Sequence, residues 1–229
     1  MTPLTGLFTL KVVTNEQVVN TMQLDILPDH IVNCPQLGES GRYNERRLNG
    51  KDGYILMSFG DTSNFNGPTS FSIFAKIDFA SQSFAGVMLD HISGQRFGCE
   101  ARTSEFQADL NFGPFMPLPT WPGNEFTGTE NPGDVHSYYR FDYEGSQIGK
   151  ASIGVIGQPE AWTGPSASVI YPSNNEELLV FGTNRLVTYG AVVDRSNSDI
   201  QLKEGMYINP FSGGGYYGTW EASLKAVSA

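Results

Sequence analysis

Short segments of β-forming residues alternate with turns along the whole chain. Residues 70–77 show the clearest alternation of apolar and polar side chains, and this spacing places Phe71, Ile73 and Ile77 on one face of a predicted strand. Similar alternation or a shorter strand-like run occurs in residues 54–59, 149–156, 178–181, 186–193 and 218–227. In the last of these, Trp220 and Ala222 share one side. The pattern predicts an all-β protein.

Helical periodicity is weak throughout the sequence. The best candidate, residues 15–27, places Val18, Val19, Met22 and Ile26 at helical spacing, but its valine and threonine content fits a strand or coil equally well. Glycine and proline number 26 and 13 and are spread over the whole chain, as in turn-rich proteins. We find no repeat of fixed period, which disfavours solenoids and propellers. The predicted fold is a β-sandwich or β-barrel.

The segment of residues 113–133 differs from the rest because it holds five prolines together with glycines and aromatic side chains. Its length and composition predict a long ordered loop. Ordered loops on β scaffolds often carry binding residues. We therefore expect part of a ligand surface in or beside this segment.

The charge balance argues against a nucleic-acid-binding protein. The 229 residues include 14 basic and 24 acidic side chains, a formal net charge of −10. The one basic concentration, Arg42 with Arg46 and Arg47, is interrupted by Glu45, so we expect no nucleic-acid contact. No window approaches the roughly 18 consecutive apolar residues of a membrane helix, and we expect no membrane insertion.

Residues for metal or covalent chemistry are scattered. The three histidines, His30, His91 and His136, form no HxH or HExxH pair, so the sequence predicts neither a metal nor a cofactor. Cys34 and Cys99 belong to no CxxC motif, and a single disulfide between them is possible.

Hydrolysis of a sugar would require two carboxylates that face each other across a cleft. Glu100, Glu105 and Asp109 are the candidates, and Glu105 and Asp109 would share a strand face. Glu100 would lie on the opposite face with Arg102. This arrangement resembles an edge strand of mixed charge as much as a catalytic floor, so no catalytic residue is predicted.

Aromatic residues are more suggestive than acids. Several lie in or beside turn-rich stretches, where a core position is harder to argue: Trp121, Tyr138, Tyr139, Tyr143, Trp162, Tyr216 and Tyr217. Such rings stack on sugars or anchor protein interfaces, although packing in the core explains any one of them equally well.

Five residues combine a stacking ring with charged and hydrogen-bonding groups within twenty positions: Trp121, Asp134, His136, Tyr138 and Arg140. Carboxylates and charged donors beside an aromatic ring are suited to sugar hydroxyls. We predict a ligand surface here. Packing of the same residues against the sheet is the competing interpretation.

A polysaccharide lyase on a β-jelly-roll is the alternative function. Such lyases pair arginine with glutamine or histidine near the uronate and use tyrosine to move the proton, types that Arg102, Gln107, His136 and Tyr138 supply. A free-standing lectin would need the same loop chemistry as an attachment domain, so the sequence leaves that choice open as well.

Several short motifs follow one another in order along the chain. They include Tyr171-Pro172 followed by residues 176–181, and residues 7–10, 20–21, 26–29, 47–50, 114–117, 192–195, 202–203, 205–207 and 217–227. The order of these motifs resembles the protruding domain of calicivirus (norovirus-like) major capsid proteins. The most specific match is the first, which is similar to the family's Tyr-Pro-Pro-Gly-Phe-x-Glu-Val-x-Val-Phe strand.

This resemblance implies a spike domain on the virion surface, made in the host cytoplasm. It implies a homodimer that attaches to a host cell-surface receptor, a glycan or a protein. It also implies a lower β subdomain from residues 1–57 and 182–229 that carries an inserted upper β-barrel of residues 58–181, the whole forming one compact unit.

Overall fold

The computed structural model describes residues 4–14, 17–60, 69–108, 125–144, 147–158, 161–171, 176–182, 187–196, 200–209 and 216–224. Within these ranges every regular element is a β-strand except one short 3-10 turn, η1 (Pro35–Leu37). The predicted all-β fold is confirmed. Among the same residues, no helix has the length and apolar character that a membrane crossing requires.

The first eight strands form a closed barrel in which each strand pairs antiparallel with the next and β8 returns to β1. Their bounds are β1 (Gly6–Thr14), β2 (Gln17–Leu27), β3 (Ile31–Cys34), β4 (Glu39–Arg47), β5 (Asp52–Gly60), β6 (Thr69–Asp78), β7 (Ser83–Asp90) and β8 (Arg96–Arg102). Closure leaves no free edge on this sheet.

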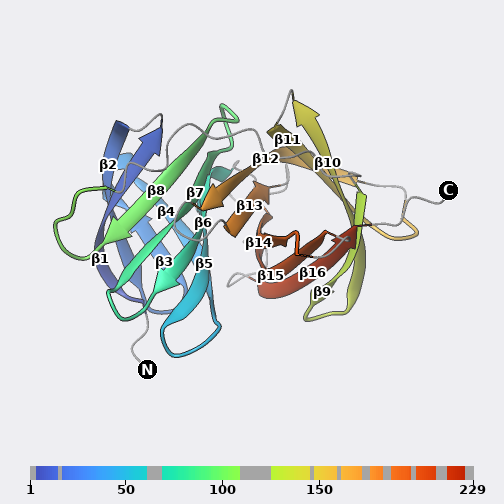
Figure 1. Cartoon of the computed structure of the whole chain (residues 1–229), viewed down its shortest axis with the longest axis horizontal. Helices are drawn as coiled ribbons and strands as arrows, with labels where there is room; N and C mark the ends of the chain where they lie inside the picture. Colours follow the sequence, from blue (N-terminus) through green and yellow to red (C-terminus); the bar gives the residue numbers. More distant parts are fainter. Residues whose placement is uncertain are drawn as a thin grey trace.

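The next eight strands close into a second barrel with the same connectivity, β9 pairing with both β10 and β16. Their bounds are β9 (Glu125–Asn131), β10 (Val135–Glu144), β11 (Gln147–Val155), β12 (Ala161–Tyr171), β13 (Glu176–Gly182), β14 (Thr188–Asp194), β15 (Gln201–Asn209) and β16 (Tyr216–Leu224). Figure 1 shows the two barrels side by side.

This arrangement differs from the layout that the resemblance implied. The barrels follow one another along the chain, and neither is inserted into the other. The expected boundaries at 57/58 and 181/182 fall inside β5 and β13, whose backbone hydrogen bonds continue across those positions. A boundary placed there would cut two central strands, so the strand pairing sets the division between residues 102 and 125.

Each barrel has its own apolar interior. Alternate residues of the strands point inward, as the predicted face of Phe71, Ile73 and Ile77 does in the first barrel. In the second barrel Trp220 and Ala222 lie inside, which confirms the predicted alternation at the C-terminal strand. An eight-stranded barrel is just wide enough for side chains to fill its interior.

A third apolar cluster joins the outer faces of the two barrels. It is composed of Tyr54, Leu56, Phe74, Val87, Leu89, Leu178, Val180, Val192, Met206 and Ile208. Strands such as β5 and β13 are therefore buried on both faces, which explains why their sequences are nearly continuous apolar runs.

Strand contacts across the junction follow a two-fold pattern. Strand β4 contacts β15, while β7 contacts β12, and β6 contacts β13. When the strands are counted along each barrel, the fourth strand of the first barrel contacts the seventh of the second. The seventh strand of the first barrel contacts the fourth of the second, and the sixth contacts the fifth. The junction thus resembles an isologous dimer interface within one chain.

Residues 17–27 form strand β2, one of the alternatives that the sequence left open, in keeping with their β-branched content. Another segment differs in part from its expected form. The segment of residues 113–133 is not a loop throughout, because β9 begins at Glu125. The remaining prolines of this segment up to residue 122 lie outside the described residues.

Candidate functional site

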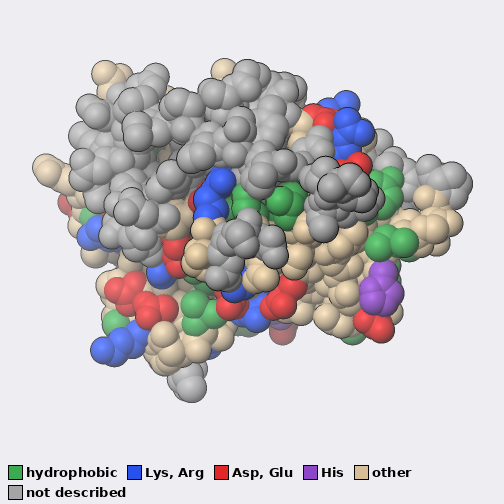
Figure 2. All heavy atoms as spheres, turned by 45° about the vertical axis from the view of Figure 1, so that its right-hand side comes forward, with side chains coloured by type: hydrophobic (Ala, Val, Ile, Leu, Met, Phe, Trp, Pro, Cys, Tyr) green, Lys and Arg blue, Asp and Glu red, His purple; other side chains and the backbone are tan. Residues whose placement is uncertain are grey.

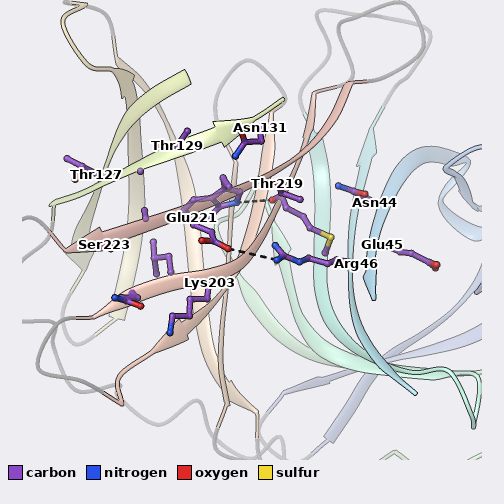
Figure 3. A pocket seen from close by; sticks show the side chains of 16 residues that line it. Asn44, Glu45, Arg46, Thr127, Thr129, Asn131, Lys203, Thr219, Glu221 and Ser223 are labelled. Atoms are coloured by element: carbon purple, nitrogen blue, oxygen red, sulfur yellow. Dashed lines mark hydrogen bonds and ion pairs between the residues drawn. The ribbon is translucent and has the colours of Figure 1, made fainter. Parts of the chain in front are cut away.

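A groove of about 820 Å³ opens where the second barrel meets β4 of the first. Its wall on the second barrel consists of β9, β15 and β16. The side chains that Figure 3 labels around it are Asn44, Glu45, Arg46, Thr127, Thr129, Asn131, Lys203, Thr219, Glu221 and Ser223. Most of them carry hydroxyl, amide or charged groups.

The register of β9 and β16 explains this polar surface. Asn131 pairs with Thr219, Thr129 with Glu221, and Thr127 with Ser223, so three cross-strand polar pairs follow one another on the outer face. The residues that alternate with them, including Phe126 and Trp220, point into the barrel. A sheet with one face in the core leaves the other face polar.

The floor of the groove is held rigidly by the core beneath it. Trp220 is fully buried, and its indole N–H donates to the carbonyl oxygen of Met206 at 3.0 Å, which ties β16 to β15. A Cβ on Gly128 would lie 2.0 Å from the carbonyl oxygen of Glu221, so only glycine allows this close approach of β9 to β16. The polar row is therefore preorganised on a stiff sheet.

Charges of both signs line the groove. Arg46 reaches from the first barrel, and its Nε lies 2.8 Å from Oε2 of Glu204. Its Nη2 lies 3.9 Å from Oε1 of Glu221 (Figure 3). The side chain of Glu221 is 67% exposed, so its carboxylate is open to a ligand. Figure 2 likewise shows basic and acidic side chains interspersed on the face it presents.

Lys203 completes the positive side of the groove. Its Nζ donates to Oδ2 of Asp194 at 2.6 Å. Hydrogen bonds from Lys203 and from Ser196 hold the pKa of Asp194 well below its usual range. Asp194 therefore stays ionised at neutral pH, and it orients the ammonium group at the rim.

The predicted site residues lie on the neighbouring strand. His136, Tyr138 and Arg140 are alternate residues of β10, so they form one row on the outer face of the second barrel. The Nδ1 atom of His136 lies 3.3 Å from Oγ1 of Thr129, which connects this row to the groove. Arg140 pairs with Asp142 at 3.0 Å.

Asp134 and Trp121 do not join this row. Asp134 is exposed in the turn between β9 and β10, where it adopts a positive φ of 50°, a conformation that aspartate tolerates better than most residues. Trp121 lies outside the described residues. The structure thus places three of the five predicted residues on one strand face, beside the groove but not among its lining.

Two aromatic residues of the turn-rich stretches pack against apolar clusters of the structure. Tyr139 is fully buried inside the second barrel, where its ring contacts Trp220 at a centroid distance of 4.7 Å. Tyr217 packs at the junction and stacks on His30 at 4.5 Å. Tyr139 thus takes the core position, one of the two that the sequence left open, because Ser137, Tyr139 and Phe141 form the inward face of β10. The side chains of Tyr143, Trp162 and Tyr216 lie outside the described residues.

The lyase constellation is not assembled. Arg102 ends β8 of the first barrel, whereas His136 and Tyr138 belong to β10 of the second, and Figure 1 places these strands at opposite sides of the molecule. Arg102 instead forms an ion pair with Glu100. Their strand pairs with both β1 and β7, so it is not the edge strand that the sequence suggested. Asp109 lies outside the described residues.

Other reactive residues are embedded in the fold. Cys34 and Cys99 are both buried as free thiols, so the possible disulfide is absent. Among the described residues, no group of three or more histidine, cysteine or acidic side chains could hold a metal ion. Glu130 lies within the second barrel, where burial raises its pKa against the opposing hydrogen bonds of Tyr139 and Tyr189.

Comparison with known proteins gives no relative: no family model, no curated protein and no solved structure matches this chain. The function must therefore be argued from the groove and from the residues around it.

Proposed function

We propose that the protein binds carbohydrate in the groove between its two barrels. The observation that carries this proposal is the row of polar pairs on β9 and β16, faced by Arg46 from β4. A saccharide presents several hydroxyl groups in a flat array, and each can donate and accept hydrogen bonds. A rigid surface of threonine, serine, asparagine and glutamate matches that array with little loss of side-chain entropy on binding.

The neighbouring row on β10 extends the proposed surface. Tyr138 lies across from Gly154, whose missing side chain leaves room for the ring: a Cβ there would lie 2.4 Å from the ring atoms of Tyr138. The ring is half-buried, so its remaining face is available for stacking on a sugar. His136 and Arg140 flank it with hydrogen-bond donors.

An attachment role would follow if the ligand is a host glycan. The resemblance to calicivirus protruding domains supports this part of the proposal, with the groove as the receptor surface of a spike and the chain as a homodimer. The lectin alternative uses the same groove without a capsid. Light scattering of the purified chain tests the dimer, and a monomer at high micromolar concentration would contradict it.

The binding test uses a broad glycan panel, followed by titration calorimetry of the best ligand. We expect Glu221→Ala to weaken binding by about tenfold, because a hydrogen bond to a charged group contributes about 1.5 kcal/mol or more. Thr127→Val, which keeps the shape of the side chain, should weaken it by a smaller factor. Glu105→Ala and Thr103→Val change the same residue types at exposed positions that do not line the groove, and they should leave the affinity unchanged.

Two results would overturn the proposal. The first is no binding to any glycan of the panel. The second is an affinity that neither groove variant changes. If Tyr138→Ala or His136→Ala abolishes binding while both groove variants bind normally, the site lies on β10 alone and the groove assignment fails.

A further inference from the structure

The two ends of the first barrel differ in how they are closed. At one end Leu4, which precedes β1, is fully buried in the interior cluster. Phe79 in the turn after β6 covers the same end, and the guanidinium carbon of Arg47 lies 3.8 Å from the centroid of its ring. These side chains seal the barrel at the end where the β2–β3, β4–β5 and β6–β7 turns lie.

The opposite end holds a pocket of about 390 Å³. Its lining comes from the ends of β1, β2, β4, β6, β7 and β8 together with η1 and the β7–β8 turn. The residues are Val12, Val19, Asn20, Met22, Leu37, Glu39, Ser70, Phe71, Met88, Asp90, Ile92 and Phe97. Mouths of β-barrels are common ligand sites, and this volume lies within the range of small-molecule pockets.

Apolar side chains around this mouth are exposed to solvent. Seven large apolar residues are exposed in the described part of the chain, and four of them, Val18, Val19, Leu37 and Ile92, surround this one end. Ile92 is the most exposed of the seven at 77%. Single exposed apolar residues need no explanation, but a cluster around a pocket marks a binding surface.

Acidic groups provide the polar contribution to the rim. Glu39 accepts a hydrogen bond from Ser70, and Asp90 accepts backbone N–H groups of the β7–β8 turn at 2.8 and 3.1 Å. These contacts fix the two carboxylates in place. The described residues that line the mouth include no lysine, arginine or histidine, so the local charge is negative.

The interior below the rim can adapt to a ligand. Met22 and Met88 belong to the lining, and methionine side chains rearrange easily around apolar groups. Phe71 stacks on Phe59 at a centroid distance of 4.1 Å and provides a flat apolar wall. The pocket thus combines an apolar interior, a sealed far end and an anionic rim.

We propose that this mouth binds a small amphipathic cation, whose apolar body enters the barrel while an amine or quaternary ammonium group lies near Glu39 and Asp90. The apolar lining removes the body from water, which is the main driving force. The negative rim selects a positive head group over a negative one. This site is separate from the proposed carbohydrate groove and takes a different class of ligand.

Methionine-methyl NMR can test this proposal and locate the ligand. The chain has six methionines, of which Met22 and Met88 line the mouth and Met206 lines the groove. The intact protein, labelled with ¹³C at its methionine methyl groups, is titrated with decyltrimethylammonium and with decyl sulfate below micelle formation. Methionine-to-leucine variants assign the signals.

We expect decyltrimethylammonium to shift the Met22 and Met88 signals saturably and to leave Met206 unchanged. Decyl sulfate, which has the same chain, should bind about fivefold more weakly because of its charge. Glu39→Gln should reduce this preference, and Glu105→Gln is the control at an exposed position. Ile92→Asn should weaken binding about threefold, while Ile156→Asn, the same change on the other barrel, should have no effect.

Several results would overturn the proposal. The proposal fails if the Met22 and Met88 signals do not shift, if both probes bind with equal affinity, or if Ile92→Asn binds decyltrimethylammonium like the parent protein. Shifts of the same signals that depend on protein concentration without a probe would mean that a second copy occupies the mouth. A change at Met206 alone would place the probe in the groove, so the two sites are tested independently.

Discussion

Replacing Gly190 with alanine tests the close contact between the two barrels. Gly190 lies on the outer face of β14, and a Cβ at this position would lie 2.3 Å from Cδ2 and 2.6 Å from Cγ of Phe74 on the first barrel. Favourable carbon–carbon contacts lie near 3.5–4.0 Å. The added methyl group would therefore overlap the ring by more than an ångström.

Phe74 has no room to move away from the new methyl group. Its ring is fully buried and stacks on Tyr54 at a centroid distance of 5.6 Å and an angle of 15°. Overpacking of this kind costs about 1–3 kcal/mol. For a chain of this size, each kcal/mol lowers the Tm by about 2–4 °C.

The assay is urea unfolding followed by two probes. Far-UV circular dichroism reports on both barrels, whereas tryptophan fluorescence reports on the second half of the chain, since the tryptophans are residues 121, 162 and 220. Gly190→Ala should shift both curves to lower urea concentration. Gly50→Ala is the matched control because nothing lies within 4 Å of its Cβ position, and it also corrects for the effect of alanine on the unfolded chain.

A double-mutant cycle tests whether the contact with Phe74 causes the loss of stability in Gly190→Ala. Phe74→Leu removes part of the ring, so the cost of Gly190→Ala should be smaller in that background, with a coupling of at least 0.5 kcal/mol. If Gly190→Ala is as stable as Gly50→Ala, or if its cost is the same with phenylalanine and leucine at position 74, the two barrels do not meet as described.

Two further predictions concern buried titratable groups. Burial lowers the pKa of His91 to about 4, against a partly opposing effect of Asp90. Below pH 6.5 the unfolded chain therefore binds a proton at this histidine that the folded chain does not, and the free energy of unfolding should fall by about 3 kcal/mol between pH 6.5 and pH 4. In His91→Gln the fall should be smaller by that amount. Equal pH dependence of the two proteins in urea unfolding would refute this assignment. Burial also raises the pKa of Cys34, and that of Cys99 to about 12, so a thiol reagent at pH 8 should label neither quickly until the chain unfolds. Fast labelling of the native protein would contradict their burial.

Local alternation in the sequence predicted some of the strands, which correspond to β5, β6, β11, β13, β14 and β16. The face of Phe71, Ile73 and Ile77 follows from a period of two, and the structure places it inside the first barrel. The same rule applies to β10, where Ser137, Tyr139 and Phe141 alternate with His136, Tyr138 and Arg140. The sequence left Tyr139 open between core and surface, because its turn-rich surroundings were weighed equally against packing in the core.

The groove could be predicted only in part. Thr219 and Glu221 lie on the outer face of β16 because they alternate with Trp220, which points inward. Their outward position could therefore be predicted from the sequence. Their partners on β9 and Arg46 on β4 were not, because strand pairing and the packing of one barrel on the other depend on contacts distant in the chain. The apolar runs of β5 and β13 are typical of strands buried on both faces, but such a run does not show what covers the second face.

The two-fold pattern of the junction changes what a homodimer would require. Obligate dimer interfaces are apolar and rich in aromatic residues and methionine, and in this chain Tyr54, Phe74 and Met206 already meet between its own barrels. A second copy would need another surface. In the described part of the chain the large exposed apolar residues lie mainly at the mouth of the first barrel. A dimer formed there would compete with the proposed amphipathic cation. The ligand should then shift the dimer toward monomer, whereas a dimer formed elsewhere would be unaffected by it.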